Sequence, residues 1–219
     1  GELDPFTGYL AAGVQTLADA GADFAVLAAN TAHIVFDEIR ERSKIPLISI
    51  AEATFDQARK LGLQRLGLLG TRFTMEAKFY PEVFGREGLT IVTPNETERA
   101  LVNEKYFGEL LNNIFLPETR DQLLHIVKRM KEQDEIDGLI LGGTELPLIL
   151  RDADARIELV EAPVSFEYGF ASAERVVADA EPRHDAVPFH IVLLGKVLRR
   201  NCESAREGEC ELPLVRREH

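Results

Sequence analysis

The sequence predicts an α/β fold with parallel sheets flanked by helices, and three observations support this class. Along residues 9–153, short and continuously apolar segments alternate with longer amphipathic segments. Apolar strands between amphipathic helices are typical of a parallel sheet that is covered on both faces. The chain has 219 residues, of which 45% are hydrophobic, so it can bury a core. We therefore expect a ligand to bind beyond the carboxyl ends of the strands.

The first 62 residues predict three helices separated by two strands. In the first helix, Leu10, Val14 and Leu17 lie on one face, and Gly21 ends the helix. We exclude residues 1–7 from the fold prediction. The predicted elements are a helix over 9–21, a strand over 23–29, a helix over 32–43, a strand over 46–50 and a helix over 51–62.

The alternation of strands and helices continues beyond this point. Gly88 closes one predicted helix, and Pro117 suits the first turn of another, where the missing N–H is tolerated. The predicted strands lie over 65–70, 89–93 and 138–143, and the predicted helices over 74–88, 96–115 and 117–134, followed by a short apolar segment over 145–151. Farther on, the pattern allows a strand and a helix over 163–180, a strand over 188–198 and a polar tail over 199–219.

The composition argues against several classes of function. The 25 basic and 37 acidic residues give a net charge of −12, which disfavours duplex nucleic acid because binding it depends on neutralising phosphates. No apolar run approaches the roughly 18 residues of a membrane span, and no signal peptide is visible. Cys202 and Cys210 lie in a charged tail and are interpreted as incidental thiols. We expect a cytoplasmic protein that binds no metal, nucleic acid or membrane.

Three predicted strands end in a similar way, with small residues followed by polar ones. A Thr hydroxyl beside the free amides of a helix start can bind a carboxylate or a phosphate. The same threonine also stabilises a helix as an N-cap, by roughly 1 kcal/mol, without any ligand. Three such ends favour a small ligand with one or more carboxylates. The polar residues are Asn30 and Thr31 after the first strand, Thr71 and Thr74 after the second, and Thr144 and Glu145 after the third.

Two residues at these strand ends are candidates for acid–base chemistry. His33 lies in a first helical turn, where it either transfers protons or caps the helix as a partly buried ring. Glu145 either acts as a general base or interacts favourably with the positive end of its helix. Tyr80, Lys105 and Tyr106 lie on amphipathic helices and are interpreted as surface or packing residues.

At these positions the sequence resembles the aspartate/glutamate racemase family of cofactor-independent amino-acid racemases. Residues 29–33, Ala-Asn-Thr-Ala-His, are similar to the family signature Cys-Asn-Thr-x-His. Residues 142–145, Gly-Gly-Thr-Glu, are similar to Gly-Cys-Thr-Glu. The resemblance covers roughly residues 9–153, and the stretches at 68–75, 78–84 and 114–120 also look like those of racemase-like bacterial proteins.

This resemblance implies two similar, Rossmann-like α/β halves with the active site between them, usually in a homodimer. It implies an isomerase that inverts the α-carbon of aspartate, glutamate or a related amino acid, with neither pyridoxal phosphate nor a metal. In the family, one thiolate removes the α-proton and a thiol on the opposite face returns one. The residues that it assigns to the substrate carboxylates and amino group are Asn30, Thr31, Thr71, Thr74 and Thr144.

The sequence departs from the family at both thiol positions. Ala29 and Gly143 stand where the family has cysteine, and neither a methyl group nor a hydrogen can accept an α-proton. One hypothesis is a racemase in which other groups, His33 and Glu145, replace the thiols. A second is a catalytically silent protein that binds an amino acid or dicarboxylate on the racemase scaffold. A third is a lyase or isomerase of another carboxylate, such as a maleate-like diacid.

The resemblance also predicts that the first half is truncated. The family's first strand, its glycine-rich loop and its second strand are expected before Tyr9 and are absent there. We expect a remnant of the N-terminal half over 1–62, the second half over 63–160, and a divergent segment with a mobile tail over 161–219. A gene fragment with a disrupted end would explain this pattern, and so would a variant in which the strand within 188–196 replaces a missing one.

Overall fold

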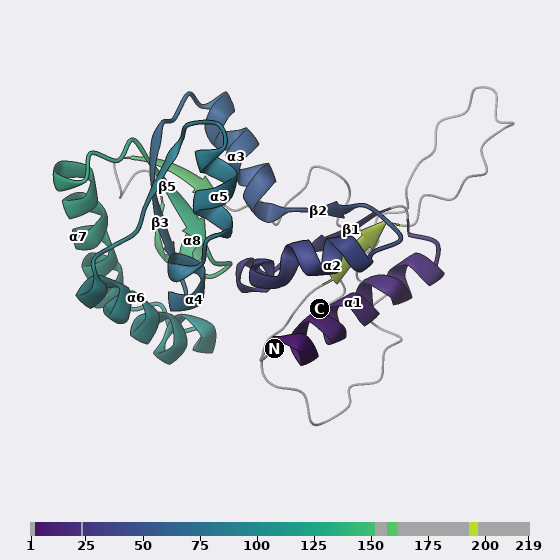
Figure 1. The fold of residues 1–219 in the computed structure, drawn as a ribbon. Coiled ribbons are helices and arrows are strands. Elements are labelled where there is room, and N and C mark those ends of the chain that lie inside the picture. The colour runs from purple at the N-terminus through teal and green to yellow at the C-terminus, as the bar shows by residue number, and fades with distance from the viewer. Residues whose placement is uncertain (1–2, 23, 152–156, 162–192, 197–219) are drawn as a thin grey trace, which may run out of the picture.

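The computed structural model describes residues 3–22, 24–151, 157–161 and 193–196, and within these ranges the strands form two sheets. Figure 1 shows the two sheets next to each other, each with its own helices. The first has the strand order β2-β1-β7, with β1 (Phe24–Leu27), β2 (Leu47–Ile48) and β7 (Leu193–Lys196). The second has the order β4-β3-β5-β6, with β3 (Arg65–Gly70), β4 (Thr90–Val92), β5 (Gly138–Gly142) and β6 (Glu158–Glu161).

The first sheet is mixed. β1 pairs parallel with β2, with Ala25 opposite Leu47, as the sequence predicts. β1 also pairs antiparallel with β7, with Val26 opposite Leu194. β7 lies within the segment in which a strand was expected over 188–198, and the structure places it beside β1.

Helix α1 (Asp4–Asp19) covers this sheet and begins five residues before the predicted start at Tyr9. Pro5 suits a first helical turn because its missing N–H would have no helical partner there, and the acidic Asp4 is favourable at the positive end of the helix. Gly21, with φ of 84°, follows the helix end in the left-handed conformation that glycine adopts without a steric penalty. The segment after β1 consists of η1 (Asn30–Val35) and α2 (Phe36–Arg42).

The second sheet is parallel throughout, and its two central strands alternate their side chains between two apolar layers. Leu66 and Leu68 of β3, with Ile140 of β5, face one layer, whereas Leu69, Leu139 and Leu141 face the other. This period of two is the geometry of a strand whose faces are both buried. The register places Leu68 opposite Ile140 and Gly70 opposite Gly142, so β3 and β5 end level with each other.

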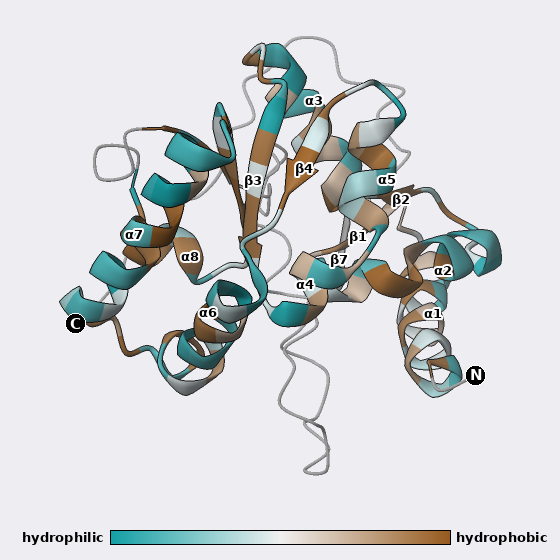
Figure 2. Ribbon diagram, turned by 60° about the vertical axis from the view of Figure 1, so that its left-hand side comes forward, coloured by the Kyte–Doolittle hydropathy of each residue, from teal (hydrophilic) through white to brown (hydrophobic). Residues whose placement is uncertain are grey.

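Helices cover both faces of this sheet. The first layer comes from α3 and α5, and the second from α6 and α7. Figure 2 shows that α6 and α7 carry hydrophilic residues on their outer sides. Along the described ranges, none of the helices combines the length and hydrophobicity needed to cross a membrane. The bounds are α3 (Ile50–Lys60), α4 (Arg72–Glu76), α5 (Phe79–Gly85), α6 (Glu96–Gly108), η2 (Leu110–Asn112), α7 (Pro117–Gln133) and α8 (Leu146–Ile149).

The helix predicted over 74–88 is instead two helices, α4 and α5, and Pro81 supplies the physical reason. In one continuous helix, Pro81 would have no N–H to donate to the carbonyl of Ala77, and its ring would clash with that carbonyl. The backbone leaves the helical conformation at Ala77, where ψ is 158°, and α5 begins afresh at Phe79. Pro81 then lies in the first turn of α5, where no helical hydrogen bond is lost.

The remaining differences concern the end of one helix and one additional strand. The predicted helix over 96–115 ends at Gly108, and η2 follows it. β6 is a strand that the sequence analysis did not predict. The strand and helix allowed over 163–180, and the tail with Cys202 and Cys210, lie outside the described residues.

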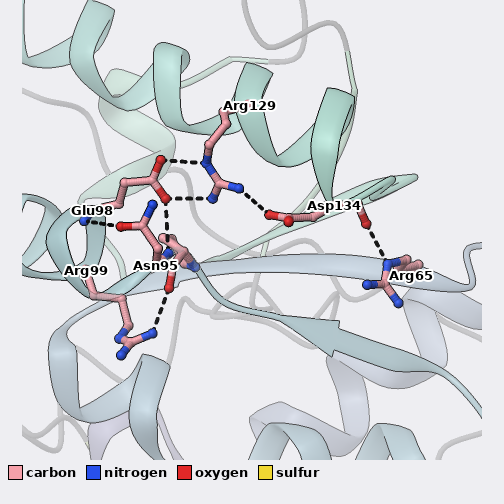
Figure 3. Close-up of polar contacts among 7 residues, drawn as sticks. Arg65, Asn95, Glu98, Arg99, Arg129 and Asp134 are labelled. Carbon is pink, nitrogen blue, oxygen red and sulfur yellow. Dashed lines mark hydrogen bonds and ion pairs between the residues drawn. The ribbon is translucent and has the colours of Figure 1, made fainter.

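Arg129 joins the two helices on the outer face of the second sheet. From α7 it donates to both carboxylate oxygens of Glu98 on α6, at 2.6 Å each, and to Asp134 at 2.6 Å (Figure 3). The main-chain carbonyl of Asp134 in turn accepts a 2.6 Å bond from Arg65 at the start of β3. The planar guanidinium matches the two oxygens of one carboxylate, a geometry that a lysine ammonium cannot reproduce.

Replacing Arg129 with lysine should therefore destabilise the protein. We expect Arg129→Lys to lower the free energy of unfolding by about 1–2 kcal/mol, because the bidentate bond to Glu98 is lost. Urea unfolding measures this difference. Lys128→Arg on the same helix is the matched control and should change stability by less than about 0.5 kcal/mol. Equal stabilities of Arg129→Lys and the control variant would contradict the role given to Arg129.

Candidate functional site

The candidate site lies where the carboxyl ends of β1, β3 and β5 are followed by polar residues. The chain passes from the first sheet to the second between β2 and α3, and Ser49 caps α3 by accepting a hydrogen bond from the amide of Glu52. Contacts between the two sheets' flanking segments come from Asn30, Thr31 and His33. These three residues all belong to η1, directly after β1.

Three threonine hydroxyls from the two parts of the chain form one cluster. The Oγ1 atom of Thr31 lies 3.2 Å from that of Thr71 and 3.4 Å from that of Thr74. The Oγ1 atoms of Thr71 and Thr74 are 3.1 Å apart. Thr71 is also the N-cap of α4, since its hydroxyl accepts from the amide of Thr74. The structure thus confirms the capping interpretation for Thr71, and the binding of a carboxylate by these threonines stays a prediction.

Two glycines make this cluster possible. A Cβ atom on Gly70 would lie 2.8 Å from the carbonyl oxygen of Gly142 and 3.1 Å from the Cβ of Thr74. A Cβ atom on Gly142 would lie 2.8 Å from the carbonyl oxygen of Leu69. The ends of β3 and β5 therefore admit no side chain, which lets Thr74 pack over both strands.

The hydroxyl cluster can serve either end of an amino acid. Each hydroxyl has one donor hydrogen and two acceptor positions, and the hydrogen rotates to suit its partner. Hydroxyls that donate to one another present their remaining acceptor positions to an ammonium group. Rotation of the same hydrogens would let them donate to a carboxylate instead.

Asn30 is held by a tyrosine that the sequence analysis interpreted as a packing residue. The buried hydroxyl of Tyr80 donates to Oδ1 of Asn30 at 2.7 Å. Burial raises the pKa of Tyr80, so this hydroxyl keeps its proton. The bond turns the amide NH2 group of Asn30, with its two donors, away from Tyr80. A fully buried tyrosine needs a hydrogen-bond partner, and this is the signal that could have identified Tyr80.

His33 uses both of its ring nitrogens to bind main-chain groups. Its Nδ1 atom lies 3.1 Å from the carbonyl oxygen of Ala29, and its Nε2 atom accepts a 2.9 Å bond from the amide of Ile50 at the start of α3. The ring stacks on Phe36 with centroids 4.9 Å apart. Burial lowers the pKa of His33 to about 4. This geometry favours the capping interpretation, because a neutral ring joins the first part of the chain to α3.

Glu145 has two hydroxyl donors and is partly exposed. Its Oε2 atom accepts from the hydroxyl of Tyr106 on α6 and, at 2.9 Å, from the hydroxyl of Thr144. Burial, and next the neighbouring Glu145, raise the pKa of Tyr106. Thr144 is exposed and directs its hydroxyl to Glu145, whereas the other three site threonines form the cluster described above. Tyr106, like Tyr80, was interpreted as a packing or surface residue, and its buried ring and hydrogen bond to Glu145 add it to the candidate site.

The side chains near the site do not resemble a metal centre. Among the described residues, no group of three or more His, Cys, Asp or Glu side chains could hold a metal ion. The chemistry that this site offers is hydrogen bonding from hydroxyl and amide groups and one carboxylate, Glu145.

Acidification should destabilise the protein through His33. The pKa of His33 is about 4 in the folded protein, below the ordinary value of 6.5. Between pH 6.5 and pH 4 the unfolded chain therefore binds a proton that the folded ring excludes. The free energy of unfolding falls as the pH drops through this window. The loss should be on the order of 2–3 kcal/mol. Urea unfolding at both ends of the window measures this loss. The difference in free energy of unfolding between the unaltered protein and His33→Gln should shrink as the pH falls.

The control for this measurement is His125→Gln on the exposed side of α7, which should leave stability at neutral pH unchanged. A constant difference between the unaltered protein and His33→Gln across the window would contradict the assignment of a neutral, buried imidazole.

Comparison with known proteins shows the family and the fold of this chain. The Asp/Glu/hydantoin racemase pattern matches residues 3–164. An Asp/Glu racemase candidate from Yersinia pestis is 33% identical with a TM-score of 0.69, over 74% of this chain and 70% of that chain. An aspartate racemase homologue from Pyrococcus horikoshii OT3 is also 33% identical, with a TM-score of 0.65, over 71% of this chain and 68% of that chain.

A glutamate racemase from Aquifex aeolicus is 29% identical over 146 residues, which are 65% of this chain and 54% of the relative. The chain thus spans little more than half the length of that enzyme. Residues 3–164, which the family pattern matches, include the strand ends, the hydroxyl cluster and Glu145. On the extent of the family match and the shared α/β fold, this chain belongs to the Asp/Glu/hydantoin racemase family.

Proposed function

We propose that this chain binds an acidic or related amino acid beside its strand ends and moves the proton on its α-carbon, as an amino-acid racemase that uses no pyridoxal phosphate. The observation that carries the proposal is the cluster of Thr31, Thr71 and Thr74, which draws on both parts of the chain. Membership of the family supports it, and the aspartate and glutamate racemase relatives support an acidic amino acid.

The hydroxyl cluster and Asn30 are the proposed binding groups. The cluster offers acceptors to an ammonium and donors to a carboxylate, and the amide NH2 group of Asn30 adds two donors. Thr144 would serve a second carboxylate of an acidic substrate by turning its hydroxyl away from Glu145, which Tyr106 would continue to hold. The sequence resemblance supports the further proposals of a homodimer and a cytoplasmic location, with no metal in the reaction.

Glu145 is the proposed proton acceptor. An α-proton is weakly acidic, so a base must be positioned within hydrogen-bonding reach of it. Glu145 is the carboxylate at the end of β5, next to Thr144 and the strand ends. On the other side, Ala29 offers a methyl group, and His33 would act as a base only after its Nε2 atom released the amide of Ile50.

A second candidate function is binding of an amino acid without turnover. The observation that favours it is the arrangement on the side of β1, where Ala29 carries no acid–base group and both nitrogens of His33 are engaged. Inversion of an α-carbon needs proton transfer on opposite faces, and a single base would support exchange on one face only. Binding and exchange measured separately distinguish the two candidates.

Removal of one cluster hydroxyl should weaken ligand binding. Thr31→Val keeps the shape of the side chain and removes a hydroxyl that contacts both Thr71 and Thr74. We expect the Kd for L- or D-glutamate or aspartate to rise about tenfold, the equivalent of roughly 1.4 kcal/mol. Isothermal titration calorimetry measures this. Thr16→Val on the exposed side of α1 is the matched control, and an equal Kd for the two variants would contradict the binding site.

The α-proton signal should disappear from aspartate or glutamate incubated with the protein in D2O. Proton NMR follows this exchange, and Glu145→Gln should slow it at least a hundredfold, since general bases contribute about 10²–10⁴-fold. Glu118→Gln on the exposed face of α7 is the matched control and should exchange at the unaltered rate. Binding with a persistent α-proton signal would establish the second candidate, and absence of both would refute both.

A further inference from the structure

The space beside Gly143 is filled by a side chain from another helix. A Cβ atom on Gly143 would collide with the hydroxyl of Tyr106 and would lie 2.7 Å from its Cε2 atom and 2.8 Å from its Cζ atom. Such separations are shorter than any normal contact between carbon atoms. A side chain at position 143 and the present position of the Tyr106 ring therefore exclude each other.

The Tyr106 ring can move aside only if the side chains packed around it move as well. It is 4% exposed and belongs to the apolar layer formed by α6, α7 and α8 with the second sheet. Val102, Leu110 and Leu146 are members of the same layer. A buried aromatic ring in a close-packed layer shifts only if its neighbours shift too. A Cβ atom at position 143 would consequently displace the hydroxyl from its hydrogen bond with Glu145.

The Tyr106 hydroxyl holds the proposed base. It reaches Glu145 from α6, across 39 residues of sequence, while Thr144 donates to the same Oε2 atom from the adjacent position. Two donors on the Oε2 atom fix the orientation of the carboxylate. The Oε1 atom then has more unused acceptor positions than the Oε2 atom. Because the pKa of Tyr106 is raised, the phenol stays a donor throughout the neutral range.

We propose that Tyr106 is the positioning residue for Glu145. Gly143 is required for this role, because only a residue without a side chain leaves space for the Tyr106 ring. The inference rests on the proposed function for the role of Glu145, whereas the coupling of positions 106 and 143 stands on packing alone. Gly143→Cys by itself would therefore expel the Tyr106 hydroxyl and misplace Glu145.

A double-mutant cycle on stability tests the coupling. Gly143→Ala should lower the urea midpoint of unfolding when Tyr106 is present and leave it unchanged in a Tyr106→Ala background, where the ring is gone. Gly85→Ala is the matched control, since a Cβ atom there meets nothing within 4 Å, and its effect should be the same in both backgrounds. An equal loss from Gly143→Ala in both backgrounds would overturn the inference.

A second cycle tests the action through Glu145. Tyr106→Phe keeps the ring and removes the hydroxyl, so it should lower the kcat of α-proton exchange about tenfold with little change in KM. In a Glu145→Gln background, Tyr106→Phe should not lower the exchange rate further. If Tyr106 had a purely structural role, Tyr106→Phe would lower the exchange rate by the same factor with Glu145 and with Gln at position 145. That result would overturn the inference. Tyr9→Phe on the exposed side of α1 is the control. Absence of exchange in the unaltered protein refutes the proposed function and the role of Tyr106 in it, while the stability cycle still decides the coupling.

Discussion

Burial of β3 and β5 between two apolar layers is the constraint on which the rest of the second sheet depends. Leu68 and Ile140 face one layer, and Leu69 and Leu141 face the other. A register slip of one residue would exchange the faces of a strand, so the two layers hold the strands level. Their ends at Gly70 and Gly142 are then opposite each other. This alignment sets where α4 starts and hence where the hydroxyl cluster forms.

Neutral hydrogen bonds connect the two parts of the chain at the candidate site. Tyr80 donates to Asn30, His33 accepts from the amide of Ile50, and Thr31 contacts Thr71. Burying a neutral pair costs much less than burying a charge, so such bonds suit a closely packed junction. The raised pKa of Tyr80 and the lowered pKa of His33 are the consequence of that burial. The carboxyl group of Glu145 is partly exposed and accepts hydrogen bonds from Tyr106 and Thr144.

Sequence patterns predicted most strands and helices because each pattern reports a local cause. The continuous apolar run of β5 predicts a strand buried on both faces, and the structure confirms it. The prediction of one helix over 74–88 was wrong, because the apolar pattern continues on both sides of Pro81 and was given more weight than the proline. β6 was not predicted, because this short strand is stabilised by its pairing with β5 and not by a local sequence pattern.

The sequence by itself determined the family, the α/β class and the polar residues at three strand ends, because motifs and periodicity are properties of neighbouring residues. Only the tertiary structure decided what those residues contact. It brought Thr31, Thr71 and Thr74 within hydrogen-bonding distance, engaged both nitrogens of His33 and placed the Tyr106 ring against Gly143. Tyr106 and Gly143 are 37 positions apart on different elements, and no periodic pattern encodes their contact. Packing of α6 against the second sheet creates it, because the ring fills space that glycine leaves open.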